Sequence, residues 1–350
     1  SSPIVFGDRV FFTSQTGSVP IRQGVATRLA RDDQDLAGRE NPMGGRNMQP
    51  AQHGDKVLLV VEAFGRANGR RLWKYSTPAT GELPELNEKH NLATPTPATD
   101  GKLVYALFGN GQIVALDMDG KPAWTRHLGK EYSPFQVQWG HGGSPTLYRD
   151  MLLVLCDHTP KSYLIALDKN TGQERWKADR GTGRVSHCTP TIAHGPKSDE
   201  LIINSSERVD AYNPANGELL WYTGSPRQTP VPSAAFHNGV IYLIRGYRNS
   251  DFMAIRPGGR GEIKPGEYIW RVASGALGGN GPHSRILLSG LWLGPVGKVV
   301  ASNRPVLHRA SPGEFAMRNG TMLSPSAGLI NLSINSAHAF NAARFSSAHS

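Results

Sequence analysis

The chain has 350 residues, with a formal net charge of +10, 19% charged residues and 38% hydrophobic residues. This composition excludes an intrinsically disordered charged tail, and two cysteines are too few for a disulfide scaffold or a Cys-based zinc ribbon. The 40 glycines and 25 prolines are typical of a turn-rich β protein. We expect no transmembrane segment, because no apolar run is long enough, and no nucleic-acid partner, because no basic run is interleaved with aromatic residues.

The first residues of the sequence do not indicate a compartment. It begins Ser1-Ser2-Pro3, without Met and without a signal-peptide pattern, so we expect the sequence to start inside a larger protein. Between the first proline-marked strand and the first repeat tryptophan, Trp73, lie about 40 more residues than in the later repeats. We place this insert at residues 15–53. Its polar, glycine-rich composition predicts an exposed connection, which either has no function or serves as a lid or partner-binding loop.

A repeat of 45 to 52 residues organises residues 1–276. Each unit has a tryptophan with a glycine four positions earlier, namely Gly69 and Trp73, Gly120 and Trp124, Gly172 and Trp176, Gly217 and Trp221, and Gly266 and Trp270. An alternating apolar strand precedes each glycine, as in Gln112–Asp117, and the glycine closes a tight turn. We expect each tryptophan to start the returning strand and to bury its ring between neighbouring units.

A second pair of strands lies upstream of each hairpin, and proline marks its start, as at Thr189-Pro190. Each repeat is therefore four short antiparallel strands, which is one blade of a β-propeller. A single blade cannot bury both of its faces, so blades have to stack around an axis. The predicted fold is all-β, with about five visible blades in residues 1–276.

Residues 277–350 do not follow the repeat. They contain no aspartate, no tyrosine and no hairpin of the repeat type, and Trp292 has Leu288 rather than glycine four positions earlier. This tail also holds half of the net charge. We interpret it as a disordered extension or as the product of an out-of-frame reading, in which case the chain is a truncated product without activity. A repeat that resumes in another reading frame of the coding DNA would support the second interpretation.

Three histidines lie at similar places, three to five residues before the prolines that mark the inner strands of three blades. His90, His141 and His187 could converge at the mouth of the central channel, as a ligand site with Asn91 and Trp139 as neighbours. The histidines precede their prolines by five, four and three positions, so their side chains could point in different directions. Separate structural roles for the three histidines remain the alternative. We predict no metal set from motif alone.

The remaining candidates carry weaker signals. Arg256 and Arg260 flank a Pro-Gly-Gly turn and could hold a carboxylate or phosphate, or could be solvated. Cys156 and Cys188 are expected to be buried free thiols. No nucleophile motif such as Gly-x-Ser-x-Gly occurs, so we assign no catalytic residue.

The repeat resembles the pyrroloquinoline-quinone (PQQ)-like β-propeller family, which includes quinoprotein alcohol dehydrogenases and the BamB lipoproteins. The likeness rests on Leu-Asp-x-x-x-Gly-x-x-x-Trp hairpins and on the stretches 88–91, 139–142 and 254–261, and it is greatest to bacterial PQQ-binding-like β-propeller repeat proteins. It implies seven or eight blades, so the five seen here imply a truncated propeller. It also implies a periplasmic or cell-envelope location.

The resemblance implies two functions. The first is a non-catalytic scaffold that binds a protein or small molecule at its blade loops, with no cofactor. The second is a PQQ-dependent oxidoreductase that acts on an alcohol or a sugar, with Ca²⁺ beside the quinone. Family dehydrogenases usually carry adjacent cysteines against the quinone, whereas Cys156 and Cys188 are 32 positions apart. We therefore favour the scaffold.

Overall fold

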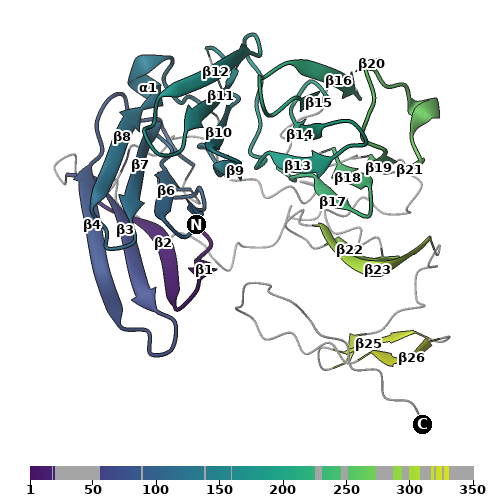
Figure 1. The fold of residues 1–350 in the computed structure, drawn as a ribbon, viewed down its shortest axis with the longest axis horizontal. Helices are drawn as coiled ribbons and strands as arrows, with labels where there is room; N and C mark the ends of the chain where they lie inside the picture. Colours follow the sequence, from purple (N-terminus) through teal and green to yellow (C-terminus); the bar gives the residue numbers. More distant parts are fainter. Residues whose placement is uncertain are drawn as a thin grey trace, which may run out of the picture.

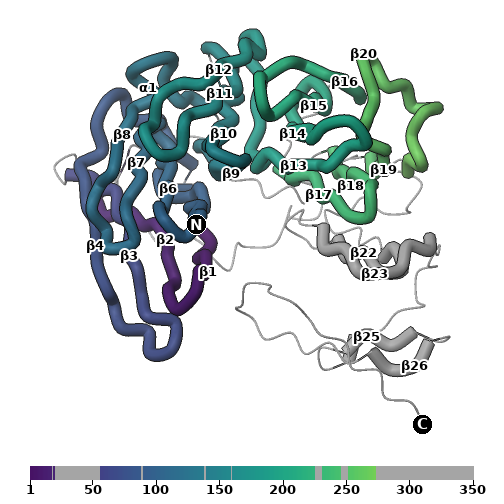
Figure 2. Tube along the Cα trace, in the orientation of Figure 1, coloured from purple at the N-terminus to yellow at the C-terminus, as the bar shows by residue number. Residues whose placement is uncertain are grey.

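The computed structural model describes residues 1–17, 19, 56–87, 90–137, 139–158, 160–224, 231–245 and 251–272, and the backbone of five strands between 287 and 330. Within the described part of residues 1–272, the strands form five sheets, each built on four antiparallel strands (Figure 1). The chain passes steadily from one sheet to the next, so successive repeats are neighbours in space (Figure 2). These sheets confirm the predicted all-β propeller blades.

The blades are numbered here from the amino terminus. Blade 1 contains β1 (Ile4–Phe6), β2 (Arg9–Thr16), β3 (Leu58–Gly65) and β4 (Arg71–Pro78), and blade 2 contains β5 (Ala98–Thr99), β6 (Leu103–Leu107), β7 (Gln112–Asp117) and β8 (Pro122–His127). Blade 3 contains β9 (Thr146–Tyr148), β10 (Met151–Cys156), β11 (Tyr163–Asp168) and β12 (Glu174–Asp179). Blade 4 contains β13 (Thr191–His194), β14 (Asp199–Asn204), β15 (Val209–Tyr212) and β16 (Leu219–Thr223). Blade 5 contains β17 (Ala235–His237), β18 (Val240–Ile244), β19 (Phe252–Ile255) and β21 (Trp270–Val272).

Three short elements stand outside this plan or extend it. The helix α1 (Leu128–Glu131) follows blade 2, and the 3₁₀ helix η1 (Pro265–Glu267) precedes β21. The strand β20 (Gly261–Glu262) pairs in parallel with β16 of the neighbouring blade. In the part of the chain with a described structure, no helix is long and apolar enough to cross a membrane.

Each blade places an alanine of its third strand opposite the repeat tryptophan. The pairs are Ala63 with Trp73, Ala115 with Trp124, Ala166 with Trp176, Ala211 with Trp221, and Ala254 with Trp270. In the first four blades the register shifts directly after this pair. A small residue opposite the indole leaves room for the ring to lie flat on the sheet, so the sequence repeat is also a repeat of local geometry.

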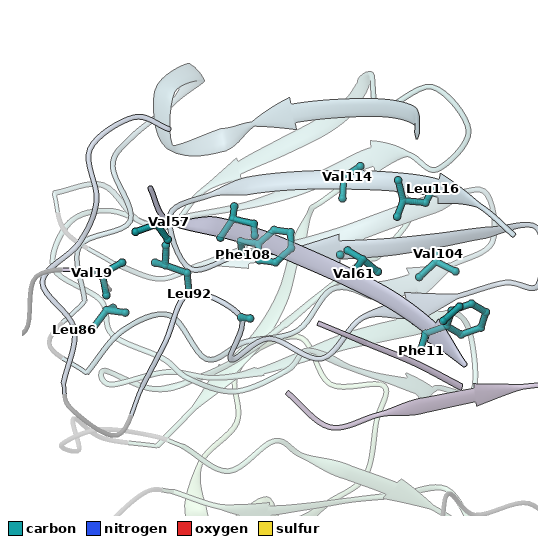
Figure 3. Packing of buried hydrophobic residues seen from close by; sticks show 14 residues of the cluster. Phe11, Val19, Val57, Val61, Leu86, Leu92, Val104, Phe108, Val114 and Leu116 are labelled. Carbon is teal, nitrogen blue, oxygen red and sulfur yellow. The ribbon is translucent and has the colours of Figure 1, made fainter. Parts of the chain in front are cut away.

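The core lies between blades rather than inside one of them. Phe11, Leu59 and Val61 of blade 1 are fully buried against Val104 and Leu116 of blade 2. Figure 3 shows Val61 beside the valines of the neighbouring blade. Burying a side chain of this size stabilises the fold by about 1.5–3 kcal/mol, so the blade faces supply most of the stability.

The repeat tryptophans form the outer part of these interfaces. The indole of Trp73 lies against Gly120, where an added Cβ would be 2.7 Å from the ring, and Trp176 lies against Gly217 in the same way at 2.5 Å. The indole N–H groups of Trp73, Trp124 and Trp176 donate to the carbonyls of Met118 (2.7 Å), Lys169 (2.9 Å) and Pro214 (3.2 Å). The tryptophan of one blade therefore packs on the hairpin turn of the next, as expected, with Trp124 buried and Trp73 and Trp176 partly buried.

Blade 5 departs from this pattern because its third and fourth strands are joined by a longer connection. Gly266 lies in η1 with open space around its α-carbon, rather than in a hairpin turn beneath an indole. Trp221 is fully buried and donates its indole N–H to Glu200 (2.8 Å), which also accepts the backbone N–H of Gly258 (2.8 Å). The long connection thus covers the tryptophan of blade 4, and Gly266 of the repeat pattern is not equivalent to the other four glycines.

A chain of hydroxyl groups joins the inner strands of successive blades. The backbone N–H of Ser2 donates to the hydroxyl of Thr96 (3.2 Å), and that of Thr96 donates to Ser144 (2.9 Å). The N–H of Ser144 donates to Thr189 (3.1 Å), and that of Thr189 donates to Ser233 (2.8 Å). Four of these five residues precede a proline, which explains why Ser/Thr-Pro marks the inner strands.

The predicted insert at residues 15–53 lies mostly outside the described residues. The strand before it, β2, ends at Thr16, so Gln15 and Thr16 lie in that strand, and the strand after it, β3, begins at Leu58. The insert itself stays a prediction. In the tail, β22 (Leu287–Leu293) pairs with β23 (Val299–Leu307), and β24 (Met317–Arg318), β25 (Thr321–Ser324) and β26 (Ala327–Ile330) form a second small sheet. Most other tail residues are outside the described ranges, so our interpretation of 277–350 stays a prediction.

Candidate binding face

Two kinds of connection lie at the same end of the sheets. In a four-stranded antiparallel blade, the connection between the second and third strands and the connection to the next blade leave from the same end. We call this end the loop face, defined by residues 79–87, 90–97, 108–111, 128–137, 139–145, 157–158, 180–190 and 205–208. The end of β2 and the start of β3 lie at this end as well.

The three predicted histidines all lie on the loop face, in three successive inter-blade connections. The rings of His90 and His187 are 6.3 Å apart between centroids. A Cβ on Gly142 would be 3.4 Å from the Cβ of His187, and one on Gly140 would be 3.5 Å from the Cβ of His90. The connection that carries His141 thus lies against both neighbouring histidines.

Burial keeps these imidazoles neutral. Burial, together with the nearby His158 and His187, lowers the pKa of His141 to about 3. Burial, together with the nearby His90, lowers the pKa of His187 to about 4. The pKa of His90 is lowered by burial alone. The cluster therefore offers neutral ring nitrogens rather than cations at neutral pH.

His158 is a fourth histidine of this cluster that the sequence did not indicate. It follows β10 and is fully buried, with its ring 4.4 Å from that of Phe135, which is also 5.0 Å from His141. A histidine after the second strand of a blade lies at the same end as those before the first strand. The strand pattern could have shown this, but a single histidine carries no repeat signal.

The two residues predicted as neighbours of the histidines differ in role. Asn91 forms a local turn, because its side-chain oxygen accepts the N–H of Ala93 (2.9 Å) and its carbonyl accepts the hydroxyl of Thr94 (2.8 Å). Trp139 is half-buried in the connection that carries His141. Asn91 therefore shapes the loop beside His90 through its own turn.

A buried ion-pair network lies beside the histidines and was not predicted. The guanidinium of Arg180 is fully buried and binds both carboxylate oxygens of Asp157, at 2.7 and 2.9 Å. It also donates to Asp210 (3.0 Å) and to the hydroxyl of Tyr212 (2.8 Å). Asp157 accepts a further bond from Ser205 (2.7 Å). The Arg180 charge thus lowers the pKa of Asp157 although its burial alone would raise it.

The same network fixes the connection between blades 3 and 4. Arg184 donates to Asp210 (2.6 Å), whose other oxygen accepts from Arg208 (2.6 Å). The hydroxyl of Ser186 donates to the carbonyl of Asn204 (2.6 Å). His187 follows directly on this segment, so its position is set by contacts to two strands of blade 4. Buried pairs of this kind hold loops in a single arrangement when all their groups are bonded.

The structure places the predicted Arg256 and Arg260 away from the histidines. They lie in the connection between the third and fourth strands of blade 5, at the opposite end of the sheets. Arg260 is half-exposed, donates to the carbonyl of Gly259 (2.6 Å) and lies 4.0 Å from Glu200. These arginines and the three histidines therefore do not form one site.

The thiols are buried and free. Burial raises the pKa of Cys188 to about 11 and raises that of Cys156 further. A thiol with a raised pKa is a poor nucleophile at neutral pH. Among the described residues, no group of three or more His, Cys, Asp or Glu side chains is arranged to hold a metal ion.

Comparison with known proteins identifies the family. The family model described as outer membrane protein assembly factor BamB matches residues 58–264. The tetrathionate hydrolase of Acidithiobacillus ferrooxidans is 24% identical over 302 residues, which cover 79% of this chain and 51% of that protein. The quinoprotein alcohol dehydrogenase PedH of Pseudomonas putida is also 24% identical, with 80% of this chain and 45% of that protein covered. The chain thus spans about half the length of these relatives.

Solved structures show the same kind of likeness. BamB from Moraxella catarrhalis is 12% identical, with a TM-score of 0.45 and coverage of 77% of this chain and 76% of that one. Quinohemoprotein alcohol dehydrogenase from Comamonas testosteroni is 14% identical, with a TM-score of 0.43 and coverage of 69% and 42%. The family model covers more than half of the chain. The chain therefore belongs to the PQQ-like β-propeller family of the outer membrane protein assembly factor BamB.

Proposed function

We propose that this protein is a non-catalytic scaffold of the bacterial cell envelope that binds a protein partner on its loop face. The observation that carries the proposal is the anchoring of that face by the buried pair of Arg180 and Asp157. A rigid set of loops on a propeller can present a fixed surface without any chemistry of its own. The BamB family model supports a role in the cell envelope and a protein as the partner.

The chemistry of the described side chains also favours binding over catalysis. The carboxylates of Asp157 and Asp210 are paired with arginines, and both thiols have raised pKa values. A general base or a nucleophile needs an accessible group whose pKa is close to the working pH. The paired carboxylates and the buried thiols do not meet this requirement.

Site-specific photo-crosslinking in living bacteria tests the proposal. A photoreactive residue replaces Asn91 or Glu207 on the loop face, and a matched control replaces Asp119, which is exposed at the opposite end of the sheets. We expect discrete protein adducts from both loop-face positions and none from position 119. Adducts from position 119 alone, or from none of the three, would contradict the proposal.

The alternative is a quinoprotein oxidoreductase, which the relationship to PedH favours. Such an enzyme needs a quinone pocket, with carboxylate oxygens for Ca²⁺ in the family dehydrogenases. The two carboxylates of the buried ion-pair network do not fit that requirement, because the guanidinium of Arg180 occupies both oxygens of Asp157 and one of Asp210. The positive charge of Arg180 beside these carboxylates also opposes the binding of Ca²⁺ there.

Titration with PQQ separates the two functions. Tryptophan fluorescence of the folded chain is followed with and without Ca²⁺, after circular dichroism has verified the β structure. The scaffold predicts no saturable quenching in either series. Saturable quenching that requires Ca²⁺ would support the oxidoreductase and would lead to assays with alcohols and sugars.

A further inference from the structure

Four histidines from four different connections lie close together on the loop face. His90, His141 and His187 belong to three successive inter-blade connections, and His158 follows β10. The rings of His90 and His187 are 6.3 Å apart between centroids, and the ring of Phe135 is 5.0 Å from that of His141 and 4.4 Å from that of His158. We call these four residues the histidine cluster. Three of them are buried and His90 is half-buried.

The carboxylate that acts on His141 is already paired. Asp157 favours the charged form of this imidazole. Both of its oxygens, however, bind the buried guanidinium of Arg180, at 2.7 and 2.9 Å. The backbone of Gly143 also favours the charged form, whereas burial and two neighbouring imidazoles disfavour it. A proton on His141 therefore finds no unpaired anion among the groups that act on it.

His187 is in a similar environment. Burial and the ring of His90 disfavour its charged form, and the backbone of Gly140 favours it. Arg184, in the same connection, is a cation that is bound to the ion-pair network. The thiol of Cys188, the next residue, is neutral, because burial raises its pKa to about 11. Protonation of His187 thus adds a positive charge that none of these groups neutralises.

The connection that carries His141 is packed against the other two. A Cβ on Gly140 would be 3.5 Å from the Cβ of His90, and one on Gly142 would be 3.4 Å from the Cβ of His187. Like charges repel strongly at short distance in a buried environment. Positive charges on these rings can therefore move apart only if one connection moves away from another.

The blades themselves do not depend on the imidazoles. In blade 3, the strands β10 and β11 are paired along their whole length, with Val154 opposite Ile165. Both residues are fully buried in an apolar core. Apolar side chains carry no group that titrates. Separation of the connections therefore does not require the blades to unfold.

We propose that the histidine cluster makes the loop face an acid-sensitive switch. At neutral pH the imidazoles are uncharged and the connections are packed together. In mild acid, protons bind the rings as soon as the connections separate and water reaches them, so the open arrangement is favoured while the blades stay folded. An open loop face loses the surface that binds a partner. This last consequence rests on the proposed function, whereas the opening itself does not.

Amide hydrogen exchange of the chain alone, at pH 7.5 and at pH 5, tests the switch. Two backbone amides of the loop face serve as reporters. The N–H of His90 donates to Asn87 (2.9 Å), and the N–H of Gly140 donates to Val137 (2.9 Å). Protection factors correct each rate for the direct effect of pH on exchange. The amides of Val154 and Ile165 report on the blade.

The expected change follows from the linkage between protonation and opening. His141 and His187 have pKa values of about 3 and about 4 in the closed arrangement and the ordinary value of 6.5 once they are solvated. Each ring then favours opening about 30-fold more at pH 5 than at pH 7.5, and the two together about 800-fold. We expect protection at the reporters to fall by these factors and to stay below that of the blade amides. Low urea should accelerate exchange in the blade only, because local opening exposes little surface.

Three variants keep the test specific. His141→Gln and His187→Gln each remove one titrating ring, so each should reduce the pH effect at the reporters about 30-fold. The two variants test the same switch independently, after circular dichroism has verified their β structure. The matched control is His194→Gln, at the opposite end of the sheets, where the side chain is 70% exposed. It should leave the pH effect at the reporters unchanged.

Two outcomes overturn the proposal. One is equal protection of the reporters at the two pH values. The other is a loss at the reporters to the same protection as in the blade, with the same dependence on urea, because the rings would then gain protons only through global unfolding. Since no partner is present, neither outcome bears on the crosslinking test of the proposed function.

Discussion

The ring of Trp124 lies on the α-carbon of Gly172, so close that a Cβ there would be 2.7 Å from the ring atom Cε3. This contact joins the fourth strand of blade 2 to the hairpin turn of blade 3. Gly69 has nearly the same backbone conformation without an indole above it. Substitution at both glycines incurs the strain of a positive φ, but only substitution at Gly172 also crowds an indole ring. Comparing the two positions therefore separates these two costs.

We expect Gly172→Ala to lower the free energy of unfolding by about 3 kcal/mol, through strain at positive φ and displacement of Trp124. Gly69→Ala should cost only the first part, about 1 kcal/mol. Urea unfolding followed by circular dichroism measures both. Equal losses would mean that the indole contact does not stabilise the blade interface.

The buried pair of Arg180 and Asp157 should be among the most sensitive places in the chain. Arg180→Met leaves the buried carboxylate of Asp157 without its paired cation, while Asp210 keeps Arg184 and Arg208, so we expect a loss of about 3–5 kcal/mol. Arg175 makes ion pairs with Asp150 (2.6 Å) and Asp168 (3.1 Å), but its side chain is 47% exposed. Arg175→Met should therefore cost less than about 1 kcal/mol. Thermal unfolding measures the melting temperatures of the two variants. Equal melting temperatures would refute this prediction.

The hydroxyl chain predicts a smaller effect with a clear direction. Thr189→Val keeps the shape of the side chain but removes the acceptor for the N–H of Ser144, so we expect a loss of about 1 kcal/mol. The matched control is Ser2→Ala, because no described residue donates to the Ser2 hydroxyl, and its cost should be below about 0.5 kcal/mol. Amide hydrogen exchange at Ser144 should accelerate in the first variant only. Unchanged exchange there would contradict the assigned bond.

The buried histidines predict loss of stability in mild acid. His141 and His187 have folded pKa values of about 3 and about 4, below the ordinary value of 6.5. As the pH falls below 6.5, the unfolded chain binds protons that the folded chain does not, so the free energy of unfolding decreases. Each histidine contributes up to about 2 kcal/mol to the difference between pH 7.5 and pH 5.

Replacement by a residue that does not titrate should remove that contribution. We expect His141→Gln and His187→Gln each to reduce the difference in unfolding free energy between pH 7.5 and pH 5, and the double variant to reduce it most. Urea unfolding at the two pH values gives the difference directly. Variants with the wild-type pH dependence would show that these imidazoles already carry protons in the folded chain.

The fold followed from the sequence because its strongest signals are local and repeated. The glycine-to-tryptophan spacing and the Ser/Thr-Pro pairs each mark a contact between one blade and the next. Gly266 shows the limit of such spacing. It stands four residues before Trp270, as in the other repeats, yet a longer connection places it in a 3₁₀ helix and Glu200 binds the indole of Trp221 instead.

The candidate site was predictable only in part. The histidines precede marked inner strands, so topology alone brings them to one end of the sheets. The partners of Arg180 could not be inferred, because Asp157 and Asp210 lie 23 and 30 positions away in different blades and follow no common spacing. Arg256 and Arg260 lie in a connection between a third and a fourth strand. Such connections lie at the other end of the sheets, so these arginines are far from the histidines.

The hydroxyl chain and the indole contacts have one more consequence, which concerns how such a chain can change in length. Every repeat from blade 2 to blade 4 carries an acceptor for the blade before it and a donor for the blade after it. Duplication or deletion of one whole repeat in the gene therefore leaves a matched contact at the new junction. Blade number in this architecture can change during evolution without simultaneous mutations on two surfaces.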